Sequence, residues 1–403
     1  MNSVPIKRVM EMMIPRFQPF FDEEEIRYFL SCQSGKAISE FEKKFAKLVG
    51  SRYAVAVPYA RTGLYALLKS LKIKQSEILV PSYTCAAIPS VVIASGNIVR
   101  FCRVSLRDYN ILPEDAFSRI TNKTKVLIPI HMYGYPANVK ALREEVDEEI
   151  LIFEDAGQGL LTKGVGKYGD AAFYSFGLYK QIFACGGGMI TTNNKDIHQR
   201  LCEYIDKNFK KQSPLSTLRN IVKFFSTYFI FDDVLYKITD IWIRKARENF
   251  YKNYFSSFRR HIPSDFLNLL HCIQAKIGLA QIKKAKDMIK RRIEIARFYD
   301  EELHNLKEIS LPPIVEGATY AYYTVRVKKR TIFEERMHKK GVAVDKFYHY
   351  SVPYRGIFRK YADDKFPNSL LASKTVVNLP IYPSLADDPE KMKQVVKAVK
   401  KSL

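Results

Sequence analysis

Short apolar runs alternate with stretches of helical periodicity in the first half of this chain, and this alternation restricts the fold more than any other feature. Helices are expected at residues 62–71, 85–94 and 138–146. Strands that alternate with helices form a mostly parallel sheet with both faces covered. The sequence therefore predicts an α/β fold with a mixed, mostly parallel sheet of seven strands. These strands are expected at residues 52–58, 78–80, 98–104, 126–130, 150–153, 171–176 and 189–192.

The second half of the chain has a different pattern. Apolar residues recur at helical spacing over residues 272–306, which predicts one long amphipathic helix that joins two domains. Beyond it we expect a strand at residues 321–327 and helices at 332–340 and 388–403. Gly341 ends the first of these helices. This order of elements indicates a small α+β domain after the long helix.

A chain of 403 residues is long for a single core, so two domains are expected. The predicted large domain spans residues 1–262 and the small one residues 263–403. Residues 204–262 carry twelve Lys and Arg against five Asp and Glu, a net charge of +7, and are expected to form a helical insertion. The aromatic residues of this insertion include Phe224, Phe225, Tyr228, Phe229, Phe231, Trp242, Phe250, Tyr254 and Phe255.

Two locations are open for the aromatic insertion. Its longest uncharged run, residues 224–231, is far shorter than the roughly 20 residues that a membrane-spanning helix needs. The insertion can still lie on an anionic membrane face, where Lys and Arg are attracted to the headgroups. The second location, with the aromatics packed against the body of the protein or a second subunit, is favoured.

The charge and the cysteines restrict partners and location. The net charge of +23 is spread along the chain without the pattern of a nucleic-acid-binding motif, so nucleic acid is not an expected partner. Six cysteines without a C-x-x-C pair indicate neither a zinc site nor a disulfide framework. Charges interrupt residues 1–17, which therefore lack the apolar core of a signal peptide. A cytoplasmic protein is expected.

Two polar strings each follow a predicted buried strand. The first contains Asp155 and the second contains Lys180, twenty-five residues later. Ligands of open α/β sheets gather at the carboxyl ends of the strands. An acid there can pair with a pyridine nitrogen and a lysine can form a Schiff base, so the two strings together predict a pyridoxal phosphate site. Both could instead be solvated surface residues, and the strand context disfavours this interpretation.

Short motifs along nearly the whole chain occur in the order of one known family. With them the chain resembles the DegT/DnrJ/EryC1/StrS family of sugar aminotransferases. This resemblance implies the fold type I of pyridoxal phosphate enzymes, which is that of aspartate aminotransferase. The motifs are ISEFE at 38–42, YAVAV at 53–57, TGL at 62–64, VPSYT at 80–84, HMYG at 131–134, EDAGQ at 154–158, SFGLYK at 175–180, GGG at 186–188, QA at 274–275, RRIEIARFY at 291–299 and NLP at 378–380.

The resemblance assigns the catalytic residues. Lys180 is expected to form the Schiff base with the cofactor and then to move the proton between cofactor and substrate carbons. Because a lysine must be neutral to attack, we expect burial to lower the pKa of Lys180. Asp155 is expected to pair with the protonated pyridine nitrogen. Gln158 is expected to bond the phenolic oxygen of the ring.

The resemblance also assigns the phosphate ligands. The backbone amides of Thr62 and Gly63 and the Thr62 hydroxyl are expected to cradle the phosphate at the start of a helix, where the helix dipole favours an anion. Ser175 is expected to add a hydroxyl.

Three positions depart from the family pattern. Arg61 replaces a small residue beside the phosphate, so it either binds phosphate or substrate or points away. Cys85 stands where many relatives have an aromatic that stacks on the cofactor ring, and it can pack there as a small apolar group. Leu267 falls where an asparagine from the partner subunit is expected, with Asn268 one position later.

Further polar residues near the predicted site have two possible roles. His131 follows the strand at residues 126–130 and is either structural, which is favoured, or catalytic. Six residues of the small domain either line a sugar pocket or pack in the core: Tyr320, Tyr322, Tyr323, Tyr348, His349 and Tyr350.

Taken with the resemblance, the sequence predicts a homodimeric aminotransferase. It is expected to move an amino group from glutamate to a keto group of a nucleotide-activated sugar, in the synthesis of surface polysaccharide or another glycan. Positive surface charge can attract the diphosphate of such a substrate. Relatives with histidine in place of the lysine dehydrate the sugar ring instead, and Lys180 disfavours this reaction. Aminotransfer to a non-sugar ketone also stays open, as does a non-catalytic role for a cofactor-binding protein that is regulatory or lies against a membrane.

Overall fold

The central sheet contains all seven strands that the sequence predicts. The computed structural model describes residues 13–31, 36–231 and 263–403, together with residues 235, 236, 239, 240, 242, 243, 245, 249 and 255. In chain order the strands are β1 (Tyr53–Val57), β2 (Glu77–Pro81), β3 (Ile98–Cys102), β4 (Thr124–Leu127), β5 (Leu151–Asp155), β6 (Ala171–Ser175) and β7 (Gly188–Thr192).

The strands lie in the order β1-β7-β6-β5-β4-β2-β3. Neighbours from β6 across to β3 pair in parallel, whereas β7 is antiparallel to both β6 and β1. The sheet is therefore mixed and mostly parallel, as predicted. With these strands and the structural relatives described below, the predicted fold type I is confirmed.

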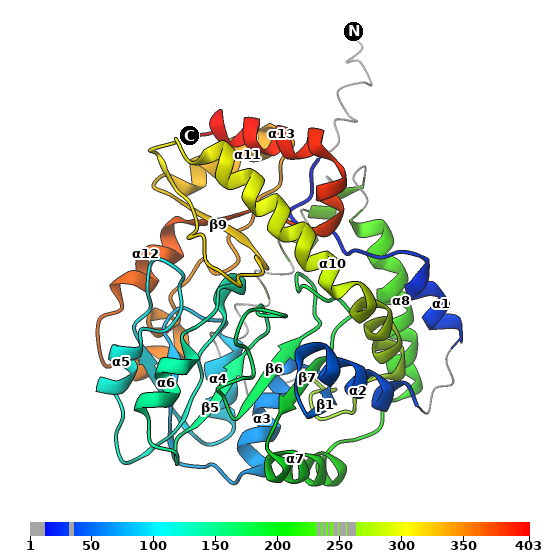
Figure 1. The fold of residues 1–403 in the computed structure, drawn as a ribbon, viewed down its shortest axis with the longest axis vertical. Helices are drawn as coiled ribbons and strands as arrows, with labels where there is room; N and C mark the ends of the chain where they lie inside the picture. The colour runs from blue at the N-terminus through cyan, green and yellow to red at the C-terminus, as the bar shows by residue number, and fades with distance from the viewer. Residues whose placement is uncertain are drawn as a thin grey trace.

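Helices cover both faces of this sheet (Figure 1). On one face α3 (Ala60–Ser70), α4 (Ala87–Ala94) and α7 (Lys195–Asn208) pack against residues such as Phe153 and Phe173. On the other face, α2 (Ala37–Val49) packs against the β6–β7 end, and α5 (Pro113–Ser118) and α6 (Val139–Glu145) pack farther along the sheet. Burial on both sides explains why the strands read as continuous apolar runs.

A second sheet follows in the last third of the chain. Its strands β8 (Ile309–Ser310), β9 (Tyr323–Val327) and β10 (Val376–Leu379) are antiparallel, in the order β10-β9-β8. Helices α11 (Arg330–Lys339), α12 (Pro367–Thr375) and α13 (Pro389–Lys400) accompany it. The predicted strand and both predicted helices of this region are present.

One long helix connects the two sheets. This helix, α10 (Cys272–Leu303), contacts α1 (Glu23–Ser31) and α2 near its start and α13 near its end (Figure 1). The predicted joining helix is therefore confirmed. The domain boundary at residues 262 and 263 stays a prediction.

The predicted insertion begins in the last turns of α7 and continues with helix α8 (Pro214–Ile230), which lies beside α1 (Figure 1). Phe224 is buried, with its ring 5.5 Å from that of Phe21 and 5.6 Å from that of Phe29. Trp242, in contrast, is 74% exposed. The prediction that the aromatics pack against the protein body holds for part of the set. The structure does not describe Phe250, Tyr254 or the side chains of Tyr228 and Phe229.

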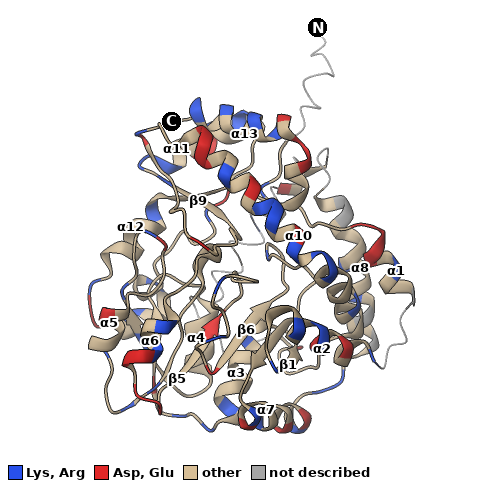
Figure 2. Cartoon of the chain, in the orientation of Figure 1, with Lys and Arg blue, Asp and Glu red and all other residues tan. Residues whose placement is uncertain are grey.

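Basic residues are distributed over several elements. Figure 2 shows Lys and Arg on α2, α6, α10 and α13 rather than on one helix. Within the ranges described above, no helix is both long and apolar enough to cross a membrane. The predictions made for residues 1–12 lie outside the described residues.

Candidate active site

Asp155 is the last residue of β5, at the carboxyl edge of the sheet. Its backbone N–H donates to Pro129 O (2.8 Å) and its carbonyl accepts from His131 N–H (3.0 Å), which fixes the strand end. Its Oδ1 accepts a hydrogen bond from Gly157 N–H at 2.8 Å. Burial raises the pKa of the Asp155 carboxyl, while the charge of Lys180 and the Gly157 N–H act in the opposite direction.

Lys180 lies in the tight turn that follows β6. Its backbone N–H donates to Gly177 O at 3.2 Å, and the preceding Tyr179 has a φ of 67°. Its Nζ lies 5.9 Å from the centre of the Phe347 ring. Burial lowers the pKa of the Lys180 ammonium, and the negative charge of Asp155, with that of Cys85 when ionised, opposes this change. The direction agrees with the sequence expectation of a more readily neutral lysine.

Gly157 lies beside both of these groups and has no side chain to separate them. A Cβ atom at this position would lie 2.9 Å from Asp155 Oδ1, 3.6 Å from Lys180 Nζ and 3.6 Å from Ser175 Cβ. The structure therefore brings Asp155, Lys180 and Ser175 together around one side-chain-free position. An acid, a lysine and a hydroxyl brought together in this way fit the ring nitrogen, aldehyde and phosphate of pyridoxal phosphate.

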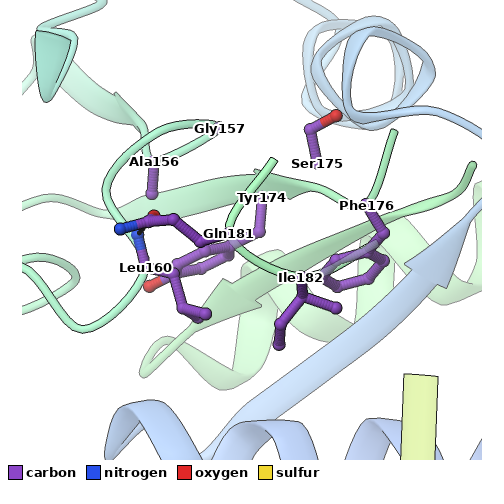
Figure 3. Close-up of a pocket in the computed structure, with 8 residues that line it drawn as sticks. All are labelled: Ala156, Gly157, Leu160, Tyr174, Ser175, Phe176, Gln181 and Ile182. Atoms are coloured by element: carbon purple, nitrogen blue, oxygen red, sulfur yellow. Dashed lines mark hydrogen bonds between the residues drawn. The ribbon is translucent and has the colours of Figure 1, made fainter. Parts of the chain in front are cut away.

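Ser175 belongs to the same face of the sheet as α3. Figure 3 shows a small cavity at the end of β6, toward which Leu160, Phe176 and Ile182 point, while Ser175 points to the opposite side. Alternation along β6 explains this difference, because Ser175 shares its face with Phe173, which packs against the α3 side. The cavity thus lies behind the site and the Ser175 hydroxyl lies on the side of the helix start.

The donors predicted to cradle the phosphate have partners within the protein at the start of α3, and their role toward phosphate stays a prediction. The amides of Thr62 and Gly63 both donate to Tyr59 O, at 2.9 and 3.1 Å, and the Thr62 hydroxyl donates to Phe266 O at 3.0 Å. All three predicted donors are therefore engaged within the protein. The amides of Ala60 and Arg61 precede them and have no acceptor within the helix.

Gly63 instead permits close packing between α3 and the sheet. A Cβ atom there would lie 2.1 Å from Ile190 Cδ1 and 3.3 Å from Val57 Cγ2. Only a residue without a side chain fits this contact. The glycine that the sequence assigns to phosphate binding is thus required by the packing of α3 on β7.

Gln158 connects the site to the last third of the chain. Its Oε1 accepts from Tyr133 N–H at 2.8 Å, and its Nε2 donates to Tyr348 OH at 2.7 Å. An amide carries two N–H groups, so one donor remains beyond the bond to Tyr348. The predicted bond from Gln158 to the cofactor stays a prediction.

Cys85 follows β2 and shares the electrostatic environment of the site. Burial raises the pKa of its thiol; Lys180 and Arg61 act against this rise and Asp155 adds to it. The thiol is therefore neutral at physiological pH, which is compatible with the predicted role as a small apolar group beside the ring.

His131 has structural partners on both ring nitrogens. Its Nδ1 accepts from Ala137 N–H at 3.2 Å, so its Nε2 carries the hydrogen that is donated to Glu154 Oε2 at 2.9 Å. Glu154 also accepts from the amides of Gly166 (3.1 Å) and Gly169 (2.8 Å). These bonds support the structural role that the sequence favoured for His131.

Two of the six candidate small-domain residues lie beside the site. Tyr348 bonds Gln158, and the Tyr322 hydroxyl donates to the backbone carbonyl of Tyr179 at 2.9 Å. In contrast, Tyr323 bonds Asp300 and Tyr320 packs against Tyr135. His349 and Tyr350 pack against each other.

Arg16, which the sequence did not reveal, supports Tyr179, the residue before Lys180. Its guanidinium donates to the Tyr179 hydroxyl at 2.6 Å and forms an ion pair with Asp345 at 3.3 Å. Burial disfavours this charge, but Asp345 and nearby groups more than compensate and raise the pKa of Arg16. No local sequence signal reveals a contact between residues more than 160 positions apart.

Comparison with known proteins agrees with this arrangement. Residues 25–220 and 251–400 match the DegT/DnrJ/EryC1/StrS aminotransferase family. The chain is 29% identical to the uncharacterized protein MJ1066 of Methanocaldococcus jannaschii, with 98% of each chain covered. It is 26% identical to a GDP-perosamine synthase of Vibrio cholerae, with 96% of this chain and 98% of the relative covered.

A solved structure of similar fold holds the expected cofactor. This is the GDP-4-keto-6-deoxy-D-mannose-3-dehydratase of E. coli with bound hydrated pyridoxal phosphate. The two chains are 17% identical and superpose with a TM-score of 0.76, over 96% of this chain and 99% of the dehydratase. Pyridoxal phosphate is the cofactor of this chain. The chain belongs to the DegT/DnrJ/EryC1/StrS aminotransferase family and is a pyridoxal-phosphate-dependent aminotransferase.

Proposed function

We propose that this enzyme transfers an amino group from glutamate to a keto group of a nucleotide-activated sugar, in glycan biosynthesis. The observation that supports the proposal most directly is the placement of Lys180 and Asp155 close together beside Gly157. The family and the Vibrio cholerae relative, a GDP-perosamine synthase, support the sugar substrate. A homodimer in the cytoplasm belongs to the same proposal.

The site residues divide the work between proton transfer and charge. When bound, pyridoxal phosphate supplies an electron-withdrawing ring that stabilises negative charge at the substrate carbon. Asp155, which is buried and carries a negative charge when ionised, is proposed to hold a proton on the ring nitrogen. Lys180 is proposed to hold the cofactor and then, as a free amine, to move the proton at the substrate carbon.

The electrostatics of Lys180 suit both of its proposed tasks. Burial favours its neutral form, which attacks a carbonyl and accepts a proton. The neighbouring Asp155 limits this effect, so that the amine can also carry and release a proton. The aromatic ring of Phe347 covers one side of Nζ and reduces its contact with water.

Amino transfer is tested by product formation with matched ketones. Purified enzyme is incubated with glutamate and a GDP- or dTDP-linked keto sugar, the same keto sugar without its nucleotide, or a small non-sugar keto acid. We expect 2-oxoglutarate and an equal amount of amino sugar, fastest with a nucleotide-linked substrate. Turnover of the small keto acid alone would contradict the proposed substrate, and release of water without 2-oxoglutarate would indicate dehydration.

A further inference from the structure

Positively charged side chains gather at the start of α3. Arg61 is the second residue of this helix, and its Cζ lies 4.0 Å from the centre of the Tyr59 ring. Its Nε is buried and has no hydrogen-bond partner among the described residues. Helix α8 adds Arg219, which acts electrostatically on Tyr59, and Lys223, which acts on Arg61.

Only one acid compensates these three cations in the described part of the chain. Arg219 forms an ion pair with Asp265, whose Oδ1 also accepts from the Tyr59 hydroxyl at 2.9 Å. Lys223 Nζ donates to the backbone carbonyl of Cys185. Asp265 also acts electrostatically on Lys223, so among the described residues this one carboxylate faces three cations, and the cluster has a net excess of two positive charges.

Lys223, a residue of α8, packs against the glycine turn that leads into β7. Cys185, Gly186 and Gly187 have φ values of 59°, 117° and 100°, a left-handed stretch that glycine adopts without strain. A Cβ atom at Gly186 would lie 3.4 Å from Lys223 Nζ. Without a side chain at Gly186, the lysine amine and Gln274 Nε2, which that Cβ would approach to 3.0 Å, both lie close to the backbone of the turn.

The same turn connects the cations to the active site. Gly188, which follows it, pairs with Ser175 in the sheet, and a Cβ atom at Gly188 would lie 2.5 Å from Ala60 N. The end of β6 therefore adjoins the first residue of α3. The field of Arg61 also reaches Cys85, where it acts on the thiol together with Lys180.

These groups together have the properties of an anion site. Arg61 and Lys223, in a cluster with an excess of two positive charges, adjoin a helix start. There the first backbone amides point outward and the helix dipole is positive. A guanidinium and an ammonium are the side chains that bind phosphate most strongly. The excess of two positive charges suits a phosphate group better than a carboxylate.

We propose that Arg61 and Lys223 form a phosphate-binding subsite at the start of α3. The phosphate comes either from the cofactor or from the diphosphate of a nucleotide sugar; the second source rests on the proposed function. Lys223 lies outside residues 25–220 and 251–400, which match the family.

Binding of phosphate-bearing and phosphate-free probes tests the subsite without turnover. The affinity of the purified enzyme for pyridoxal phosphate and for pyridoxal is measured by absorbance, and that of the cofactor-loaded enzyme for inorganic pyrophosphate by calorimetry. The variants are Arg61→Ala, Lys223→Ala and, to keep the charge, Arg61→Lys and Lys223→Arg. Lys211→Ala is the matched control, because Lys211 is an exposed lysine of the same insertion.

We expect each alanine variant to weaken one phosphate probe at least about tenfold, the effect of losing a hydrogen bond to a charged group. If affinity for pyridoxal phosphate falls but affinity for pyridoxal does not, the subsite binds the cofactor phosphate. If affinity for pyrophosphate falls, the subsite binds the diphosphate of the substrate. The charge-keeping variants should retain part of the affinity, and Lys211→Ala all of it. Unchanged affinity for both phosphate probes, or an equal loss for pyridoxal, would overturn the subsite while leaving the proposed transfer reaction intact.

Discussion

The charge state of Lys180 depends on two opposing influences that the structure identifies separately. Burial favours the neutral amine, and the carboxylate of Asp155 favours the ammonium. Burial raises the pKa of the Asp155 carboxyl, and the charge of Lys180 acts in the opposite direction. The reactivity of the lysine is therefore sensitive to a change at Asp155 that leaves Lys180 in place.

Replacing Asp155 by Asn should shift the pH dependence of cofactor capture. The neutral amine of Lys180 reacts, so the rate of capture by the apoenzyme rises with pH through the lysine pKa. Removing the carboxylate charge lowers the pKa of Lys180 further, so the midpoint of the rate profile should move to lower pH. Stopped-flow absorbance across neutral and alkaline pH measures this midpoint. A shift to higher pH would show that Asp155 does not act on Lys180 as described.

At the scale of elements, glycine at position 63 sets the distance between α3 and β7. Ile190 is buried and its side chain occupies the space where a Cβ at position 63 would lie. The position of α3 in turn determines where Arg61 and the first helical amides meet the active site.

Gly63→Ala should therefore destabilise the enzyme. Overpacking of a tight core contact costs about 1–3 kcal/mol, which exceeds the roughly 1 kcal/mol that alanine adds in helix propensity. The double variant Gly63→Ala with Ile190→Val removes the clashing Cδ1 and should recover part of the loss. Urea unfolding of the three proteins measures both effects. A Gly63→Ala enzyme that is as stable as the wild type would contradict the packing role.

Some elements of the fold could be predicted from the sequence and others could not. The seven strands were predictable because burial on both faces makes each a continuous apolar run. The strands β8 and β10 were not predicted; they have only two and four residues, too few for a periodic pattern to stand out. The convergence of Asp155 and Lys180 followed from strand ends. The bond from the Thr62 hydroxyl to Phe266 O was not predictable, because it joins residues far apart in the sequence.

At the scale of the whole molecule, the first described residues tie the two sheets together. Ile14 pairs with Val342, and Arg16 connects Tyr179 in the active site to Asp345 beyond β9. Both members of the Arg16–Asp345 pair are almost completely buried. The geometry around Lys180 therefore depends on residues from three distant parts of the chain.

Arg16→Ala should destabilise the enzyme by about 3–5 kcal/mol, because it leaves the charge of Asp345 buried without its ion-pair partner. In Arg16→Ala with Asp345→Asn, that charge is removed and part of the stability should return. Urea unfolding with far-UV circular dichroism measures the differences. If Arg16→Ala changed stability by less than about 0.5 kcal/mol, the value typical of a surface substitution, the connecting role would be refuted.

The central claim, that Lys180 and Asp155 form the cofactor site, is tested most directly by the visible absorption of the enzyme with pyridoxal phosphate, before and after glutamate is added. The matched proteins are wild type, Lys180→Ala and Lys290→Ala, whose lysine is 75% exposed on α10. We predict a band in the wild type and in Lys290→Ala that glutamate bleaches, and no such band in Lys180→Ala. A spectrum that is the same with and without Lys180 would contradict the assignment.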